Sequence, residues 1–260
     1  MEDHGMKRVF AFILHRLWFP LLIIFIWQII QNKLNNPFFP PPSKILESVQ
    51  YVVTPEWVRN SLTSSLITLL GGYLIGSILG IFVGAVLGSN AIAREIFLPI
   101  TNFIRCVPSV AKAPVILALL GIGLTTRVVT VAVAVFFSVL LTTLRAIANT
   151  DQRLVEYSNV LGFNYWRLLL QVRLPAATGE ILAGLQAALQ IATLVMVVSE
   201  MIGSGTGLGA FVIRSQSTFM IADMWLGILI LGTLGVLLNS AFYIVEKRMF
   251  PWYFDSQAIK

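Results

Sequence analysis

Two ionisable residues, Lys112 and Glu200, stand inside long apolar runs of the sequence. A charge at the centre of a bilayer costs about 2.5–3.5 kcal/mol on insertion scales, so it usually faces a cavity or a partner. Lys112 could attract an anionic solute, because Pro108 and Pro114 flank it and a broken helix there, with Ser109, could line a pathway. The alternatives are that Lys112 and Glu200 neutralise each other, or that Lys112 snorkels to an interface.

The sequence carries no pattern typical of catalysis or of metal binding. His4 and His15 show no metal-ligand spacing. The glycine-rich run 203–209 fits neither dinucleotide-binding nor P-loop spacing, so we expect a flexible or tightly turned external loop there. Because the chain lacks Gly-x-x-x-x-Gly-Lys, we expect neither ATP binding by the chain itself nor an enzyme. The single cysteine, Cys106, excludes an internal disulfide, and we expect it to be a small packed residue.

The composition is that of a polytopic membrane protein. Of the 260 residues, 57% are hydrophobic and 12% are charged, and the mean hydropathy is +0.84. Soluble domains are about 25% charged, so most side chains here must face lipid or other apolar side chains. The net charge of +6 could indicate nucleic-acid binding, but cytoplasmic loops rich in Lys and Arg explain it better, and we expect no nucleic-acid partner.

We expect an all-α membrane protein with about six transmembrane helices, since one span needs about 20 apolar residues. The candidate spans cover roughly residues 17–34, 61–88, 98–120, 126–148, 179–202 and 224–246. Pro99, Pro108 and Pro114 interrupt the third span, which should kink or begin late. The first span lacks a small-residue cleavage site, so we interpret it as uncleaved.

The spans divide the chain into three parts. Residues 1–54 hold the first span and an external connection, whose proline-rich stretch 35–43 should be extended. Residues 55–250 form the core domain, and residues 251–260 form a cytoplasmic tail. In the second span, glycines recur every fourth residue from Gly72 to Gly88, a spacing that lets helix backbones approach closely in lipid.

Charge distribution predicts the orientation of the chain. With both ends inside, twelve Lys and Arg residues lie on the cytoplasmic side and five outside, which favours N-in, C-in. The cytoplasmic set is Lys7, Arg8, Arg16, Arg94, Arg105, Arg145, Arg153, Arg167, Arg173, Lys247, Arg248 and Lys260. The external set is Lys33, Lys44, Arg59, Arg127 and Arg214.

A polar insert, residues 151–175, separates two apolar runs and falls on the cytoplasmic side in this orientation. Thr150 or Asp151 can cap a short helix to about residue 161, and Gly162 suits a left-handed helix end. A second short helix from about Asn164 should stop near Pro175, because the residue before proline avoids the helical region. The insert could be a compact knob or an amphipathic loop on the membrane surface. Its apolar surface would come from Leu154, Val155, Leu161, Leu168 and Leu169.

The spacing in this insert resembles a family signature. Glu156, then Gly162 six residues later, then Leu174-Pro175, matches the signature of inner-membrane permease subunits of ABC importers: Glu-Ala-Ala, three residues, Gly, nine residues, Ile, any residue, Leu-Pro. Tyr157 and Ser158 replace the two alanines, and valine replaces isoleucine. Stretches 104–114, 181–186, 199–202, 207–209 and 246–248 resemble the branch that imports nitrate, sulfonates and taurine.

The resemblance implies the type I ABC importer permease fold in a bacterial inner membrane. It also implies a permease homodimer, two cytoplasmic ATPase subunits that bind ATP and Mg²⁺, and an external substrate-binding protein. The insert would couple to the ATPase, with Glu156 orienting it through a salt bridge or helix-end hydrogen bonds. The ATPase-coupling residues would be Glu156, Tyr157, Gly162, Phe163, Arg167, Leu174 and Pro175, and the substrate pathway would include Lys112, Glu200 and Ser109. A secondary transporter or channel is the alternative, for which we find no convincing internal repeat and a single intramembrane acid.

Overall fold

The fold is that of a computed structural model, which describes residues 3–34, 36–203 and 205–251, without the side chains of residues 3–17, 105 and 203. All regular elements in these ranges are helices, as expected where a backbone in lipid must satisfy its own hydrogen bonds. They are α1 Asp3–Leu34, α2 Pro42–Val52, α3 Pro55–Trp57, η1 Val58–Thr63, α4 Ser64–Ser89, α5 Ala91–Cys106, η2 Ser109–Lys112, α6 Ala113–Leu120, α7 Leu124–Ala148, α8 Gln152–Val160, α9 Tyr165–Leu168, η3 Leu169–Arg173, α10 Leu174–Gly203, α11 Leu208–Ser217 and α12 Ile221–Met249. The predicted tail from residue 252 onward, and the side chains of His4, His15, Lys7, Arg8, Arg16 and Arg105, lie outside the described residues.

Four described stretches are long and apolar enough to cross a membrane: Pro55–Ser89, Leu124–Ala148, Tyr165–Ile202 and Ile221–Met249. A fifth span is the pair Ala91–Ile104 and Ser109–Leu120, which bends by 85°. The bend confirms the predicted break, and its cause is that Val107, which precedes a proline, is extended. The first predicted span corresponds to the apolar stretch Trp18–Leu34 of α1.

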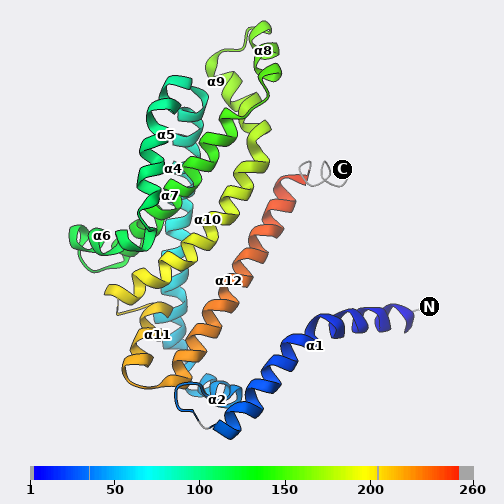
Figure 1. Ribbon diagram of the computed structural model, residues 1–260, viewed down its shortest axis with the longest axis vertical. Helices are drawn as coiled ribbons and strands as arrows, with labels where there is room; N and C mark the ends of the chain where they lie inside the picture. The colour runs from blue at the N-terminus through cyan, green and yellow to red at the C-terminus, as the bar shows by residue number, and fades with distance from the viewer. Residues whose placement is uncertain (1–2, 35, 204, 252–260) are drawn as a thin grey trace.

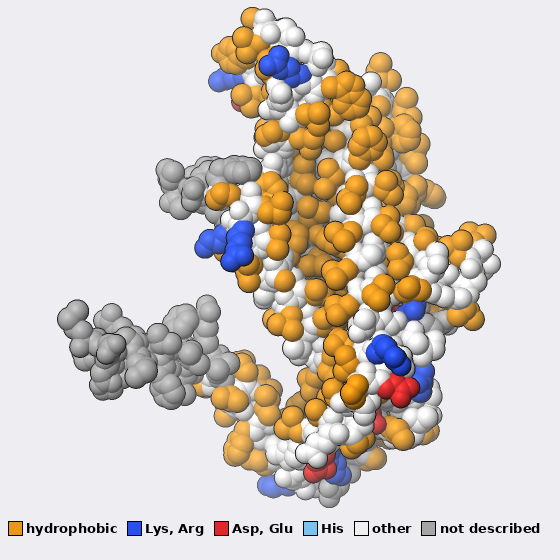
Figure 2. Space-filling view, turned by 180° about the vertical axis from the view of Figure 1, so that it is seen from behind, with side chains coloured by type: hydrophobic (Ala, Val, Ile, Leu, Met, Phe, Trp, Pro, Cys, Tyr) orange, Lys and Arg blue, Asp and Glu red, His pale blue; other side chains and the backbone are white. Residues whose placement is uncertain are grey.

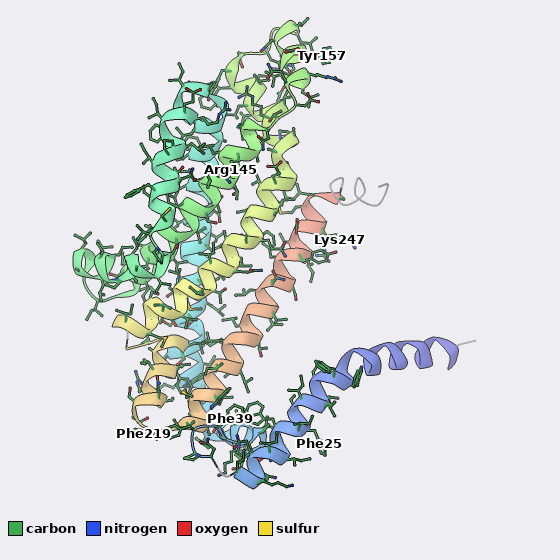
Figure 3. All side chains as sticks on the ribbon, in the orientation of Figure 1. Phe25, Phe39, Arg145, Tyr157, Phe219 and Lys247 are labelled. Atoms are coloured by element: carbon green, nitrogen blue, oxygen red, sulfur yellow. The ribbon has the colours of Figure 1, made fainter. Side chains whose placement is uncertain are left out.

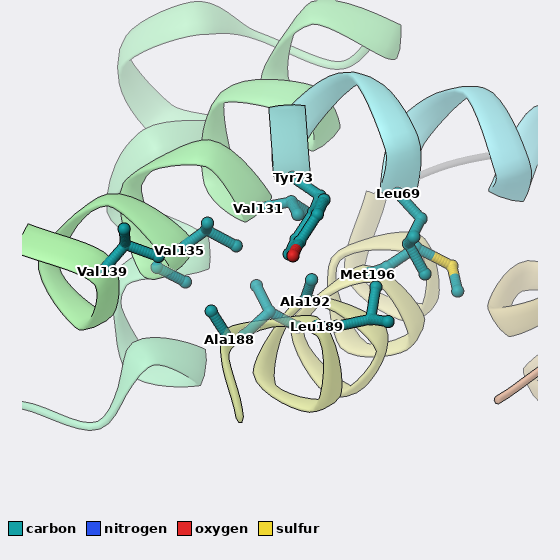
Figure 4. Close-up of a cluster of buried hydrophobic side chains, with 11 residues drawn as sticks. Leu69, Tyr73, Val131, Val135, Val139, Ala188, Leu189, Ala192 and Met196 are labelled. Carbon is teal, nitrogen blue, oxygen red and sulfur yellow. The ribbon is translucent and has the colours of Figure 1, made fainter. Parts of the chain in front are cut away.

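The core lies where α4, α7 and α10 pack together (Figure 4). The glycines of α4 face α7, and a Cβ atom on Gly76 would lie 2.5 Å from the carbonyl oxygen of Ala132. Tyr73 reaches across to α10, where its hydroxyl donates to the carbonyl oxygen of Leu185 at 3.1 Å. The glycine spacing therefore serves close helix packing, as predicted.

The helices of the body run side by side, and α8 and α9 project beyond one end of it (Figure 1). Tyr157 and Arg145 lie toward that end, Lys247 lies about midway along the molecule, and Phe39 and Phe219 lie at the opposite end (Figure 3). Arg145, which the charge count assigns to the cytoplasm, thus lies toward the same end as the insert. On the face seen in Figure 2, hydrophobic side chains cover the length of the body, as lipid or a partner helix requires.

The opposite, external end is fixed by aromatic packing. The rings of Trp27 in α1, Phe39 in the connection and Trp225 in α12 lie 4.9–5.5 Å apart between centroids. The indole nitrogen of Trp225 also donates to the carbonyl oxygen of Phe38 at 3.2 Å. The proline-rich connection after α1 is non-helical only as far as residue 41. Pro42 begins α2, because the first position of a helix tolerates the missing N–H of proline.

Candidate functional sites at the two ends of the body

The insert folds as two short helices joined at a glycine. Asp151 caps α8 by accepting from the amide of Arg153 at 2.9 Å, and Asn164 caps α9 by accepting from the amide of Arg167 at 2.9 Å. Between them Gly162 has φ +75°, the left-handed conformation that glycine adopts without a steric penalty. The predicted cap at Asp151, the predicted helix end at Gly162 and the predicted start of a second helix near Asn164 are confirmed.

The predicted stop near Pro175 is wrong. The chain continues as one helical stretch from Tyr165 to Ile202, through the π-helical turn Leu169–Arg173 and into α10. Proline lacks an N–H and its ring crowds the carbonyl four residues earlier. Because the wider π turn lies immediately before Pro175, it provides a break in the regular hydrogen-bond ladder where the ring is accommodated.

Polar contacts fix the insert to the end of α4. The Tyr165 hydroxyl lies 2.5 Å from the Ser89 hydroxyl, and the Arg173 guanidinium donates to the Ser89 carbonyl oxygen at 2.7 Å. Of the apolar residues named for the insert, Val155 and Leu169 are buried, whereas Leu154 and Leu161 are exposed. Figure 1 shows α8 beyond the end of the body and not along its flank, so the insert has the form of a projecting knob.

The outer face of the knob exposes apolar side chains. Tyr157, Val160 and Leu161 are 69%, 87% and 72% exposed. Glu156 is also exposed, and within the described residues it makes no ion pair or side-chain hydrogen bond. Its place in the middle of α8 keeps it away from both helix ends, where the capping side chains act.

The other predicted coupling residues lie at the base of the knob. The guanidinium of Arg167 lies 4.3 Å from the centroid of the Phe163 ring and donates to the Gln171 side chain at 3.0 Å. Leu174 and Pro175 line a groove between α10 and α12. The structure therefore separates an exposed apolar tip from a base that joins the knob to α10.

A buried charge cluster lies at the external end. Glu200 is fully buried, and both of its carboxylate oxygens lie 2.8 Å from the Ser65 hydroxyl. The amide of Gly209 donates to the same carboxylate at 3.0 Å, and Arg127 of α7 lies 3.6 Å from it. Arg127 also donates to the Ser64 hydroxyl at 3.1 Å. A carboxylate from α10, a cation from α7 and hydroxyls from α4 thus meet in one cluster.

The glycine-rich loop completes this cluster. Gly207 has φ +108°, and a Cβ atom there would lie 2.3 Å from the carboxyl carbon of Glu200. Its amide donates to the carbonyl oxygen of Asn60 at 2.9 Å, and the next amide, of Leu208, donates to Ser65 at 2.8 Å. The loop is therefore tightly turned and held, and its glycines allow backbone to approach a buried carboxylate.

Lys112 lies at the break between α5 and α6, and its ammonium group lies 5.2 Å from the centroid of the Phe137 ring. Mutual neutralisation of Lys112 and Glu200 is wrong, because Arg127 supplies the cation beside Glu200. Ser109 begins the short helix that ends at Lys112.

Cys106 is exposed and not packed, since it ends α5 just before the break.

Sequence reasoning missed Arg127, which it counted among the external loop charges. The available signal was its position, because Arg127 already lies inside the fourth apolar run. In that run it is 7% exposed, and a buried cation calls for a buried anion. Its partner, Glu200, lies 73 residues later in the sequence. Spacing alone could not identify so distant a pair.

A helical membrane body with a knob projecting from one end has the architecture of a membrane transport permease. The chain belongs to the family of binding-protein-dependent transport system inner membrane components, whose family model matches residues 60–251. It is accordingly an inner-membrane permease of the ABC importer class.

Several relatives share most of their length with this chain. A putative aliphatic sulfonates transport permease from Bacillus subtilis is 28% identical, over 90% of this chain and 85% of its own. A taurine transport system permease from Escherichia coli is 29% identical, over 89% and 86%. A nitrate import permease from Leptolyngbya laminosa is 25% identical, over 88% and 85%. Among solved structures, a chain of the inward-facing methionine ABC transporter MetNI superposes with a TM-score of 0.66 at 19% identity, over 78% of this chain and 98% of that one.

Proposed function

We propose that the chain is one half of a homodimeric permease, driven by two cytoplasmic ATPase subunits that bind ATP and Mg²⁺ and supplied by an external substrate-binding protein. The observation that supports this most directly is the knob. Its tip exposes Tyr157, Val160 and Leu161 at the end assigned to the cytoplasm, where lipid cannot cover them. Exposed apolar side chains grouped in this way are typical of a protein–protein contact.

The same geometry supports a route for force. Tyr165 and Arg173 tie the knob to the end of α4 through Ser89. The stretch Tyr165–Ile202 is a continuous helix, so a displacement of the knob moves α10 along its whole length. Glu200 lies near the far end of that helix, in the external cluster. Rigid-body movement of packed helices can therefore link ATPase closure to the external side.

Replacing Leu161 with aspartate should weaken binding of the ATPase subunit about tenfold or more, because it places a charge in an apolar contact centre. Folding should be unaffected, since Leu161 is 72% exposed. The measurement is co-purification of the ATPase with the permease in detergent, followed by titration of the two components.

Met220→Asp is the matched control, because Met220 is an exposed apolar residue near the external end, next to Phe219. It should leave ATPase binding unchanged. Equal binding by the Leu161→Asp variant and the wild type would contradict the docking role of the knob. Solute transport by the chain alone would support a secondary transporter instead.

For the solute we infer a small oxyanion, a class suggested by relatives named for sulfonates, taurine and nitrate. Replacing Lys112 with methionine should then abolish stimulation of ATPase activity by the anion, because the positive charge at the break of the third span is lost. Lys112→Arg, which keeps the charge, should retain stimulation. Unchanged stimulation in the methionine variant would show that Lys112 does not contact the solute.

A further inference from the structure

A second hollow lies between α10 and α12, within the span and apart from Lys112. Its lining is largely apolar, with a few polar side chains among Leu and Val residues. Its volume is about 610 Å³, and its lining includes Gln190 and Thr193 of α10 with Asn239 and Ser240 of α12. Asn239 stands ten residues before Met249, the end of its span, and Gln190 stands twelve before Ile202. At about 1.5 Å per residue both amides lie roughly 15 Å or more along the helix from these ends.

Two glycines make the room for this hollow. Gly232 and Gly235 of α12 line it, and a Cβ atom added to either would meet no described atom within 4 Å. The glycines of α4 differ, since a Cβ atom at Gly76 or Gly84 would lie 2.5–2.6 Å from a backbone oxygen of α7. Glycine therefore serves helix contact in α4, whereas in α12 it leaves open space beside polar side chains.

Polar side chains at this depth need water or a partner. Gln190 is exposed, and an amide in hydrocarbon without a hydrogen bond is costly. The hydroxyls of Ser240 and Thr193 already donate to the carbonyl oxygens of Val236 and Leu189 in their own helices. Asn239 is half-buried and accepts from the Gln186 side chain at 3.3 Å through its carbonyl oxygen. Its NH₂ group, for which the described part of the chain shows no acceptor, retains its donors. These groups all lie along the one seam between α10 and α12.

The chemistry of this lining suits an oxyanion. Side-chain amides donate hydrogen bonds to sulfonate, nitrate or carboxylate oxygens without holding them as strongly as a cation would. The lining residues include neither Lys or Arg nor Asp or Glu. Such a surface can let an anion enter and leave, which conduction along a path requires.

We propose that the α10–α12 hollow is a section of the solute path, where Gln190 and Asn239 contact a small oxyanion through neutral amide donors. This assignment rests on the proposed function for the solute class, but its location depends on this chain alone. It places the solute in water between α10 and α12 and makes the amides, along with the charge at Lys112, determinants of specificity.

The test is the reactivity of single cysteines in the assembled complex with its ATPase, reconstituted in nanodiscs. In a Cys106→Ser background, Gln190→Cys and Asn239→Cys are compared with Leu237→Cys, an exposed position on α12 outside the hollow's lining. The probes are the anionic sulfonatoethyl and the cationic trimethylammonioethyl methanethiosulfonates. Because the thiolate is the reactive form and needs water, both hollow positions should react about tenfold or more faster than Leu237→Cys.

Charge preference provides the second readout. Relative to Gln216→Cys, an exposed position in α11, the hollow positions should favour the anionic reagent, and added methanesulfonate or nitrate should slow labelling. Rates equal to that of Leu237→Cys, or a preference for the cationic reagent, would overturn the proposal. Labelling needs neither ATP nor a binding protein, so a failure here differs from loss of ATPase binding, which would instead overturn the proposed function.

Discussion

Replacing Arg127 with methionine should lower the free energy of unfolding by about 3–5 kcal/mol, the cost of removing one partner of a buried ion pair. Arg127 is 7% exposed and Glu200 fully buried, with 3.6 Å between guanidinium and carboxylate. Without the cation, the buried carboxylate keeps the hydrogen bonds from Ser65 and Gly209 but loses the opposite charge of Arg127. The measurement is the thermal unfolding midpoint of the purified protein in detergent, together with chemical denaturation.

A double-mutant cycle separates the ion pair from other contacts of the two residues. Glu200→Gln keeps an acceptor for the Ser65 hydroxyl and the Gly209 amide but carries no charge, so adding it to Arg127→Met should recover part of the loss. Arg214→Met is the control, because Arg214 is exposed and donates to the Gly205 carbonyl oxygen at 2.7 Å. Equal losses in the Arg127 and Arg214 variants, or no recovery in the double variant, would contradict the role of the cluster.

Features of the insert that depend on neighbouring residues were predictable from sequence. The caps at Asp151 and Asn164 and the left-handed Gly162 each follow from one side chain and the few amides next to it. Pro175 shows the limit of such local rules. Proline disfavours a continuing helix, but the π turn before it accommodates the ring, and no local pattern indicated that turn.

Contacts between distant residues could not be predicted in the same way. The glycine spacing of α4 correctly predicted a close helix neighbour, yet which helix that would be, α7, depends on the fold. The pairing of Glu200 with Arg127 depends on how α7 and α10 meet, and the sequence offered only Lys112, as one alternative, for that role. The glycine-rich loop near residue 207 was interpreted from its own residues, although its conformation is set by a carboxylate on another helix.

The double substitution Gly76→Ala with Gly84→Ala should destabilise the protein by about 2–6 kcal/mol, taking about 1–3 kcal/mol for each overpacked site and near-additivity at this separation. A Cβ atom at these positions would lie 2.5 and 2.6 Å from the carbonyl oxygens of Ala132 and Leu140. These obstacles are backbone atoms, so relief requires α4 and α7 to move apart. That separation would open the core around Tyr73.

Gly71→Ala makes the same chemical change on the same helix, but it should not destabilise the protein. Its Cβ atom would meet only the Val128 side chain at 3.6 Å, an ordinary contact. Since alanine is favoured over glycine within a helix by about 1 kcal/mol, this variant should be neutral or slightly more stable. Unfolding midpoints in detergent compare the variants directly. Similar shifts for Gly71→Ala and for the double variant would show that helix propensity, and not the close approach of α4 to α7, explains the glycines.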